Sequence, residues 1–203
     1  MTKVSIIVPT FNRMTLLMLR CIPSIQAQTD PDWEAHVIGD GTDEDTEKMM
    51  AELVRLDPRF RFTNLDHVGG EWATIGLAAL NHGLDTAKGD WISVLADDDW
   101  YEPDHNEFLV AEAERRGVDF CYGISQSPRG QQWGAWPPGC GQIANGAYVY
   151  RGKARDYRYD LDCLSRGRNG DEDMWIRMYE EGVTFALVPR VVHRYDPSAE
   201  RGY

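Results

Sequence analysis

"VSIIVP", at residues 4–9, is the stretch that decides the fold class of this chain. Its side chains are mostly apolar and β-branched, which is typical of a strand buried on both faces of a parallel sheet. Similar apolar runs recur along the sequence and alternate with segments of helical periodicity. This alternation predicts an α/β domain with a mainly parallel sheet.

The remaining elements follow from the same patterns. We expect further strands at residues 33–40, 60–65, 89–96, 118–124, 147–152 and 183–189. We expect helices at residues 14–28, 43–56, 71–87, 103–117 and 171–182. Pro23 should kink or break the first helix. Residues 125–146 are rich in Gly, Pro, Gln and Trp, which indicates a loop.

The bulk composition bounds the class of protein. A chain of 203 residues is most simply one domain, and it can bury a core without disulfides. The net charge of −12 disfavours nonspecific binding to nucleic acid or to anionic membranes. Four widely spaced cysteines and no apolar run of membrane length predict a reduced, cytoplasmic protein with no integral membrane segment.

Polar and acidic residues follow three of the predicted strands. "PTFNR" follows the first strand, Asp40 ends the second, and Asp97, Asp98 and Asp99 follow the strand at 89–96. In an open parallel sheet, ligands bind outside the carboxyl ends of the strands. Carboxylates there would repel the phosphates of a nucleotide unless Mg²⁺ or Mn²⁺ lay between them, whereas Asp40 could accept from a base or a ribose. The alternatives are a solvated, helix-capping turn for the three aspartates and a plain strand-to-turn exit for Asp40.

A second acidic cluster, Asp171 to Asp173, opens the last predicted helix. It either caps that helix or supplies a general base that removes a proton from an incoming hydroxyl. His193 follows the last predicted strand and could be a neutral imidazole ligand to the same metal. Trp133 and Trp136 in the 125–146 loop suit the apolar faces of sugar rings, although tryptophans in loops also cover cores.

Three segments together carry a family resemblance. The first is "VSIIVPTFNRMTLLMLRCIPSIQAQTDPDWEAHVIGDGTDEDT", the second "AKGDWISVLADDDWYEPD" and the third "DEDMWIRMYEEG". In this order they resemble the opening strand and Asp-Gly turn, the DxD segment and the acidic helix motif of family 2 glycosyltransferases. The likeness extends over roughly residues 3–195.

The resemblance implies a three-layer GT-A fold, a nucleotide-diphosphate sugar donor, Mn²⁺ or Mg²⁺, and inversion at the anomeric carbon. Carried over by position, Pro9, Thr10 and Phe11 would border the base and Asp40 would bind it. Further along the chain, Asp97 would face the ribose or the metal. Asp98, Asp99 and His193 would bind the metal. Asp171 or Asp173 would be the base.

The sequence departs from the family pattern at three positions. Ala96 stands where relatives have an Asp, which leaves the metal register uncertain by one residue. Gly170 stands where Glu is usual, so that counting back from Arg177 selects Asp171 as the base while the letters "ED" select Asp173. Residues 69–72 lack the Arg that many relatives carry, which predicts a donor preference different from uridine diphosphate.

We therefore expect one domain, with a nucleotide-sugar-binding half at 1–100 and an acceptor-binding and catalytic half at 101–203. The expected activity is metal-dependent, inverting transfer of a sugar to the hydroxyl of a glycan, lipid-linked or protein acceptor, with the 125–146 loop shaping the acceptor side. The alternatives are a nucleotidyltransferase, although "PTFNRMTLL" lacks a Gly-rich basic loop, and a non-catalytic metal- or sugar-binding module.

Overall fold

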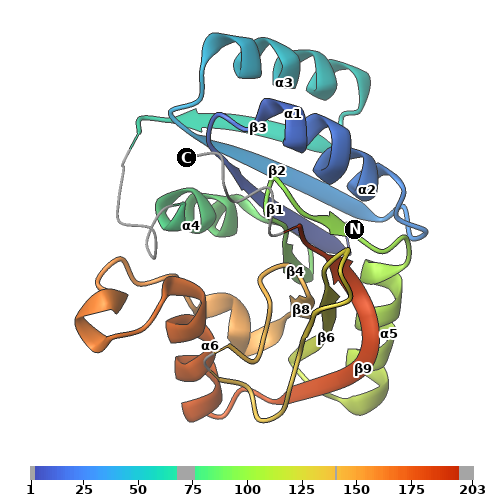
Figure 1. The fold of residues 1–203 in the computed structure, drawn as a ribbon, viewed down its shortest axis with the longest axis vertical. Coiled ribbons are helices and arrows are strands. Elements are labelled where there is room, and N and C mark those ends of the chain that lie inside the picture. The colour runs from blue at the N-terminus through green and yellow to red at the C-terminus, as the bar shows by residue number, and fades with distance from the viewer. Residues whose placement is uncertain (1–2, 68–75, 140, 197–203) are drawn as a thin grey trace.

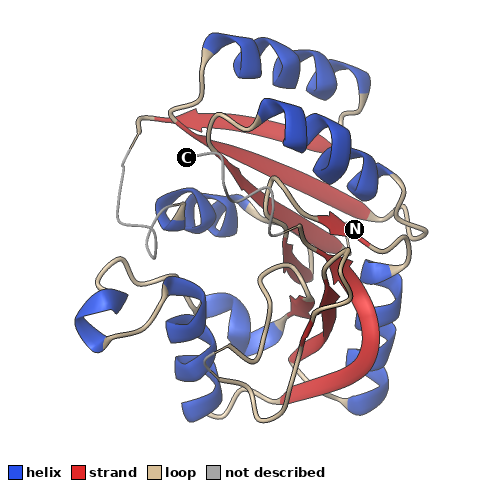
Figure 2. Cartoon of the chain, viewed as in Figure 1, coloured by secondary structure: helices blue, strands red, loops and turns tan. Residues whose placement is uncertain are grey.

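The structure is a computed structural model that describes residues 3–67, 76–139 and 141–196. Its strands are β1 (Val4–Thr10), β2 (Trp33–Asp40), β3 (Phe60–Leu65), β4 (Trp91–Val94), β5 (Trp100–Tyr101), β6 (Phe120–Gln126), β7 (Gln132–Trp133), β8 (Tyr148–Tyr150) and β9 (Phe185–Arg194). Its α-helices are α1 (Met14–Leu16), α2 (Ile22–Gln26), α3 (Glu44–Leu56), α4 (Leu77–Thr86), α5 (His105–Arg116) and α6 (Gly170–Glu180). A π-helical turn η1 (Leu17–Cys21) and the 3₁₀ turns η2 (Gly152–Asp156) and η3 (Cys163–Arg166) complete the description (Figures 1 and 2).

The described strands form one sheet in the order β3-β2-β1-β4-β8-β6-β9-β5, with β7 paired to β6. The longer pairings, β1 with β2 and β4, β2 with β3, and β6 with β9, are parallel. β8 runs antiparallel to both β4 and β6, and thereby joins the first four strands to the rest of the sheet. The predicted α/β class with a mainly parallel sheet is confirmed.

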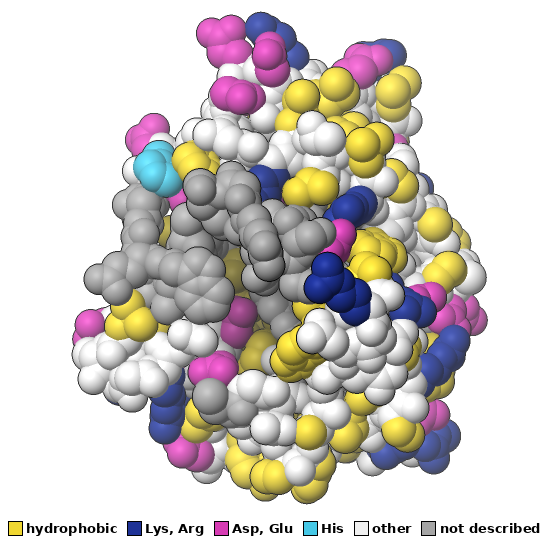
Figure 3. All heavy atoms as spheres, viewed as in Figure 1, with side chains coloured by type: hydrophobic (Ala, Val, Ile, Leu, Met, Phe, Trp, Pro, Cys, Tyr) yellow, Lys and Arg dark blue, Asp and Glu magenta, His cyan; other side chains and the backbone are white. Residues whose placement is uncertain are grey.

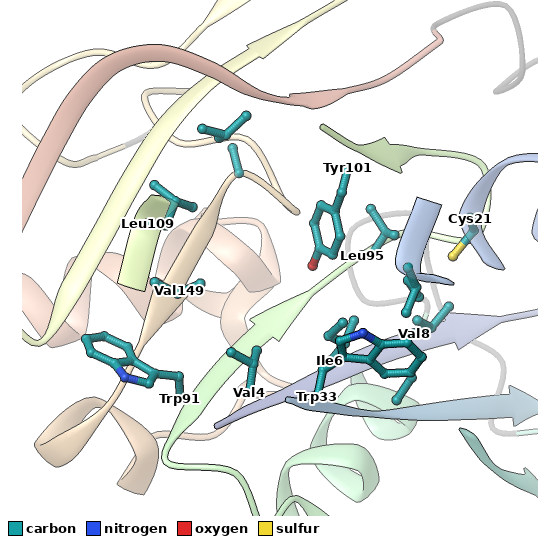
Figure 4. Packing of buried hydrophobic residues seen from close by; sticks show 14 of the residues in the cluster. Val4, Ile6, Val8, Cys21, Trp33, Trp91, Leu95, Tyr101, Leu109 and Val149 are labelled. Atoms are coloured by element: carbon teal, nitrogen blue, oxygen red, sulfur yellow. The ribbon is translucent and has the colours of Figure 1, made fainter. Parts of the chain in front are cut away.

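Helices cover both faces of the sheet, and two hydrophobic clusters fill the layers between. In β1, Ile6 belongs to the cluster beneath α2, α3 and α5, whereas its neighbour Ile7 belongs to the cluster beneath α4 and α6. Figure 1 shows α3 and the α1–α2 segment on one side of β1–β3 and α4 on the other. Figure 4 shows how Ile6 and Val8 of β1 pack with Trp33 of β2 in the first cluster.

The first predicted helix is present but is not regular. α1, η1 and α2 follow one another without a gap, and the π-helical turn ends two residues before Pro23. Pro23 stands in the first turn of α2, and its ring and missing N–H disturb the regular α-helical hydrogen bonds of a continuous helix. The predicted disturbance therefore takes the form of a π-helical turn.

The C-terminal strand is longer than its apolar run predicts. β9 continues to Arg194 because it pairs with β6 and then with the short strand β5. The prediction that His193 follows the last strand is therefore wrong, since His193 lies within β9. β5 and β7, of two residues each, were also not expected, because pairs this short leave no periodic signal.

Two other predictions meet the limits of the described chain. The first five residues of the predicted helix at 71–87, and the segment 69–72 that lacks the Arg of relatives, lie outside the described residues. The same is true of Cys140, while Cys21, Cys121 and Cys163 are buried free thiols. Within the described ranges, no helix combines the length and the apolar character that crossing a bilayer requires.

Candidate active site

A cleft of about 540 Å³ opens at the carboxyl ends of β1, β2 and β4, where the sequence predicts a ligand site. Its walls contain nine of the ten predicted site residues: Pro9, Thr10, Phe11, Asp40, Asp97, Asp98, Asp99, Asp171 and His193. In Figure 3, acidic and hydrophobic side chains lie close together at the centre of the face shown, beside atoms drawn in grey. Residues far apart in the sequence therefore share one cavity.

One end of the cleft carries a buried carboxylate beside an aromatic pair. Asp40 ends β2 and is 3 % exposed. His67 bonds the Asp40 carbonyl through Nδ1 at 2.9 Å, and its ring stacks on Phe11 with the centroids 4.7 Å apart. Gly41, with φ of 76°, allows this approach because a Cβ atom there would lie 2.6 Å from the Cβ of His67. An acceptor next to flat aromatic surface is suited to a nucleobase.

Asp97 and Asp98 lie in a turn that begins three residues after the end of β4, and Arg13 reaches both of them. The Thr10 hydroxyl donates to Asp97 at 2.8 Å, and the Arg13 Nη1 atom is 3.8 Å from Asp97 Oδ1. Arg13 also donates to the Asp98 carboxylate. Burial raises the pKa of Asp97 to about 7 against the lowering effects of Thr10 and Arg13. Arg13 therefore neutralises part of the acidic cluster.

Asp99 immediately precedes β5, which pairs with β9, and its carboxylate faces His193 of β9. The Nε2 atom of His193 lies 3.3 Å from Asp99 Oδ2, and its Nδ1 atom bonds the hydroxyl of Ser125 at 2.8 Å. Burial lowers the pKa of His193 to about 3, so its imidazole is neutral at pH 7. Gly146 packs directly on this ring, because a Cβ atom there would lie 2.5 Å from Nε2.

The chemistry of these groups fits a divalent cation in part. The buried Nε2 atom of His193 has no hydrogen-bond partner among the described residues and adjoins the Asp99 carboxylate, which gives a nitrogen and an oxygen ligand side by side. Asp98, another of the predicted metal ligands, pairs with Arg13. Within the described ranges, no three His, Cys, Asp or Glu side chains converge closely enough to hold a metal ion.

Asp171 and Asp173 have opposite environments although both lie in the first turn of α6. Asp171 borders the cleft, and burial together with the charge of Glu172 raises its pKa to about 7. Asp173 is outside the cleft lining and fully buried, where it accepts 2.8 Å hydrogen bonds from Arg166 and Arg177. These bonds outweigh the effect of burial and lower the pKa of Asp173. Of these two aspartates, only Asp171 borders the cleft and has a raised pKa.

Gly170 explains how Asp171 reaches the cleft. A Cβ atom on Gly170 would lie 2.6 Å from both Cδ atoms of Leu77, so the start of α6 packs tightly on the start of α4. The glycine that departs from the family pattern is thus the point at which these two helices meet.

Sequence reasoning missed several polar residues of this region, of which four bear on the predicted site. Arg13 and His67 contact the predicted aspartates, and Ser125 and Asn145 line the cleft. Arg13 stands in the quoted run "PTFNR", so its position after a predicted strand was an available signal. The other three lie beside the site only through tertiary packing.

The family model described as "Glycosyl transferase family 2" matches residues 5–161. This chain belongs to that family. The family 2 glycosyltransferase is 39 % identical to GalNAc(5)-diNAcBac-PP-undecaprenol beta-1,3-glucosyltransferase of Campylobacter jejuni over 100 residues. This alignment covers 49 % of this chain and 30 % of the relative. It is 33 % identical over 109 residues to a chondroitin synthase of Escherichia coli, which covers 54 % of this chain and 15 % of that protein. The glycosyltransferase chain thus spans less than a third of either relative.

Solved structures agree with this family 2 glycosyltransferase in fold. TarS of S. aureus superposes with a TM-score of 0.75 at 16 % identity, over 98 % of this chain and 37 % of TarS. The mannosyltransferase PcManGT of Pyrobaculum calidifontis was solved with GDP-Man and Mn²⁺. It superposes with a TM-score of 0.74 at 16 % identity, over 99 % of this chain and 58 % of PcManGT. The predicted GT-A fold is confirmed.

Proposed function

We propose that this family 2 glycosyltransferase moves a sugar from a nucleotide-diphosphate sugar to an acceptor hydroxyl, with a divalent metal and with inversion at the anomeric carbon. The observation that carries the proposal is the position of Asp171 in one cleft with Asp97, Asp98 and Asp99. A base and a cation-binding wall around one cavity are what a direct displacement of a diphosphate requires.

The donor nucleotide is expected at the β1–β2 end of the cleft. Pro9, Thr10 and Phe11 would border the base, Asp40 would accept its N–H groups, and Asp97 would face the ribose or the metal. Two structures in this fold class contain nucleotide sugars, TarS with UDP-GlcNAc and PcManGT with GDP-Man and Mn²⁺, which supports this type of donor.

We assign Mn²⁺ or Mg²⁺ to Asp98, Asp99 and His193. When bound, the metal would act as a Lewis acid that neutralises charge on the departing diphosphate. The neutral imidazole of His193 and the adjacent Asp99 support this assignment. Arg13 adds positive charge at the same wall, where it pairs with Asp98.

Asp171 is the proposed base. The acceptor oxygen bonds to the anomeric carbon while the bond from that carbon to the diphosphate oxygen breaks, and the acceptor proton passes to the Asp171 carboxylate. The leaving group takes the electron pair of the broken bond. Attack from the face opposite the diphosphate inverts the anomeric centre.

A thermal-shift panel of nucleoside diphosphates and their sugars, each with and without Mn²⁺, tests the proposal. A ligand that binds only the native state raises its Tm, and at 100 times its Kd the stabilisation is about 2.7 kcal/mol. We expect a shift with one base that depends on the metal, followed by release of the free nucleoside diphosphate from the matching sugar nucleotide. The absence of a shift with every nucleotide would contradict the proposal.

The same assay separates the two alternatives. Release of pyrophosphate from a nucleoside triphosphate would indicate a nucleotidyltransferase. A metal-dependent shift without turnover, unchanged by Asp171→Asn, would indicate a binding module.

A further inference from the structure

We infer that Trp133 and Asn145 form an acceptor subsite, which holds the terminal sugar of a glycan with one hydroxyl directed at Asp171. The inference rests on the proposed function, because it names the acceptor class and the recognition residues of the same cleft. Both residues line that cleft, and neither is among the residues assigned above to the donor or the metal.

Trp133 presents exposed aromatic surface at a fixed place. It lines the cleft with 39 % of its surface exposed, and the ring of Tyr195 meets it edge to face with the centroids 4.8 Å apart. The pairing of β7 with β6 sets Trp133 opposite Ser125, whose hydroxyl bonds His193. An exposed indole on the wall of a polar cleft suits the apolar face of a pyranose ring.

The loop that carries Trp133 is anchored on both sides of the tryptophan. Ser127 N bonds the carbonyl of Gln131 at 2.9 Å before it. After it, Gly134 packs so closely on β6 that a Cβ atom would lie 2.9 Å from the Gly123 carbonyl, and the Tyr122 hydroxyl donates to the Ala135 carbonyl at 2.6 Å. Recognition by a preorganised surface avoids part of the entropy cost of ordering a loop on binding.

Asn145 lines the cleft together with Asp171 and His193. Its neighbour Gly146 packs on the His193 ring, and its own side-chain oxygen accepts a 3.0 Å hydrogen bond from the buried hydroxyl of Tyr148. Asp171 lines the same cleft as Asn145.

The bond from Tyr148 fixes the orientation of the Asn145 amide. With its oxygen engaged by the Tyr148 hydroxyl, the NH₂ group is the part of the Asn145 amide that can donate to a ligand. A donor suits a cleft lined with carboxylates, because an amide oxygen in its place would add repulsion. Asn145 can therefore donate to an acceptor hydroxyl oxygen while Asp171 accepts the proton of that hydroxyl.

A sugar is the acceptor class that uses both features at once. A pyranose offers an apolar face to Trp133 and several hydroxyls to Asn145 and Asp171. A serine or threonine of a polypeptide offers one hydroxyl and no ring, and a polyprenyl phosphate would bring a phosphate toward Asp171.

The test uses a panel of methyl glycosides as acceptors, together with the donor identified by thermal shift. We expect saturation transfer from the enzyme to a subset of the glycosides by NMR, and a glycosylated product from these. Trp133→Ala should raise the acceptor KM tenfold or more and change the donor KM by much less.

Trp136→Ala is the matched control. Trp136 lies in the same loop and is more exposed, at 53 %, but it contacts Tyr179 and does not line the cleft. We expect this variant to keep the wild-type acceptor KM. An equal rise in both variants would mean that the loop, and not the Trp133 surface, matters, and would overturn the inference.

Asn145 is tested with monodeoxy analogues of the best glycoside. A site built to bind a hydroxyl rejects the analogue that lacks it, so one deoxy sugar should react far less well with the wild type but lose little further in Asn145→Ala. If every deoxy analogue loses as much activity with Asn145→Ala as with the wild type, the assignment of Asn145 is contradicted.

Failure of this inference can be told apart from failure of the proposed function. Metal-dependent nucleotide binding and donor hydrolysis, with no saturation transfer to any glycoside and transfer to a hydroxylated peptide or a polyprenyl phosphate instead, would overturn the acceptor subsite alone. The loss of nucleotide binding itself would overturn both.

Discussion

Asp171 and Asp173 are two positions apart on α6, yet tertiary packing gives their carboxylates different partners and different protonation. Residues at positions i and i+2 of a helix point to nearly opposite sides. Asp171 points to the cleft with a raised pKa, whereas Asp173 is neutralised by Arg166 and Arg177. The two residues are therefore expected to respond to substitution in opposite ways.

Asp171→Asn should reduce sugar transfer by a factor of about 10²–10⁴, the usual range for loss of a general base. Its Tm at pH 8 should equal or exceed that of the wild type, because a carboxyl whose pKa is raised in the folded state is destabilising once ionised. Transfer rates and Tm values, measured on the same preparations, check both parts.

Asp173→Asn is the matched comparison. It leaves Arg166 and Arg177 without their shared anion and should lower the free energy of unfolding by about 2–4 kcal/mol. The arginines are partly exposed, which keeps the loss below that of a fully buried pair. If Asp173→Asn abolishes transfer in a fully folded protein while Asp171→Asn does not, our assignment is wrong and Asp173 is the base.

The pH dependence of transfer belongs to Asp171. Only the ionised carboxylate can take the acceptor proton, so kcat/KM should rise with pH through an inflection at about 7 and then level off. The charge of Glu172 helps to raise that pKa, and Glu172→Gln should therefore move the inflection to lower pH. Glutamine keeps an oxygen that can accept the hydrogen bond from Gly141 N. An inflection that stays in place after this substitution would argue against Asp171 as the titrating base.

At the scale of elements, a glycine lies at the contact between α4 and β1. Gly83 lies in α4, and a Cβ atom there would be 2.3 Å from Cγ2 of the fully buried Ile7. The helix therefore lies closer to the sheet than any other residue at position 83 would permit. This approach supports one wall of the cleft, since Leu77 and Leu80 of α4 line it.

Gly83→Ala sets helix propensity against packing. Alanine gains about 1 kcal/mol over glycine inside a helix, whereas an extra methyl group in a full core costs about 1–3 kcal/mol. We expect a net loss of about 1 kcal/mol in urea unfolding, because Ile7 is enclosed and has nowhere to move.

The double variant provides the control. In an Ile7→Ala background the clashing methyl group is gone, so Gly83→Ala should now increase stability. If Gly83→Ala changes stability equally in both backgrounds, its effect does not come from the contact with Ile7.

At the scale of the whole molecule, the expected halves 1–100 and 101–203 share one sheet and both hydrophobic clusters. β4 of the first half pairs with β8 of the second. The cluster around Ile6 and Val8 also contains Leu109 of α5 and Val149 of β8. The cleft takes Asp97 from one half and Asp171 from the other.

A fragment of residues 1–100 should therefore fail to fold cooperatively, because it exposes the edge of β4 and the apolar surface that α5 and β8 cover. Far-UV circular dichroism through a urea titration measures this, with the full chain as control. A sigmoidal transition in the isolated fragment, accompanied by metal-dependent nucleotide binding, would establish the first half as an independent unit.

The sequence by itself determined the class of fold, most of its elements and the edge of the sheet at which the site lies. These properties are local, because apolar periodicity is written in windows of a few residues and parallel strands bring their carboxyl ends to one edge. The runs at Val4–Thr10 and Trp91–Val94 therefore predicted where Asp97 and Asp98 would lie.

Only the tertiary structure decided which partners these residues meet. Arg13 and Asp98 are 85 positions apart, and no local pattern relates them. His193 lies within a strand because β9 pairs with β6 and β5, and Asp171 faces the cleft rather than Asp173 because Gly170 packs against Leu77. Side-chain burial, ion pairing and pKa depend on distances across the fold, and those distances exist only once the layers have packed together.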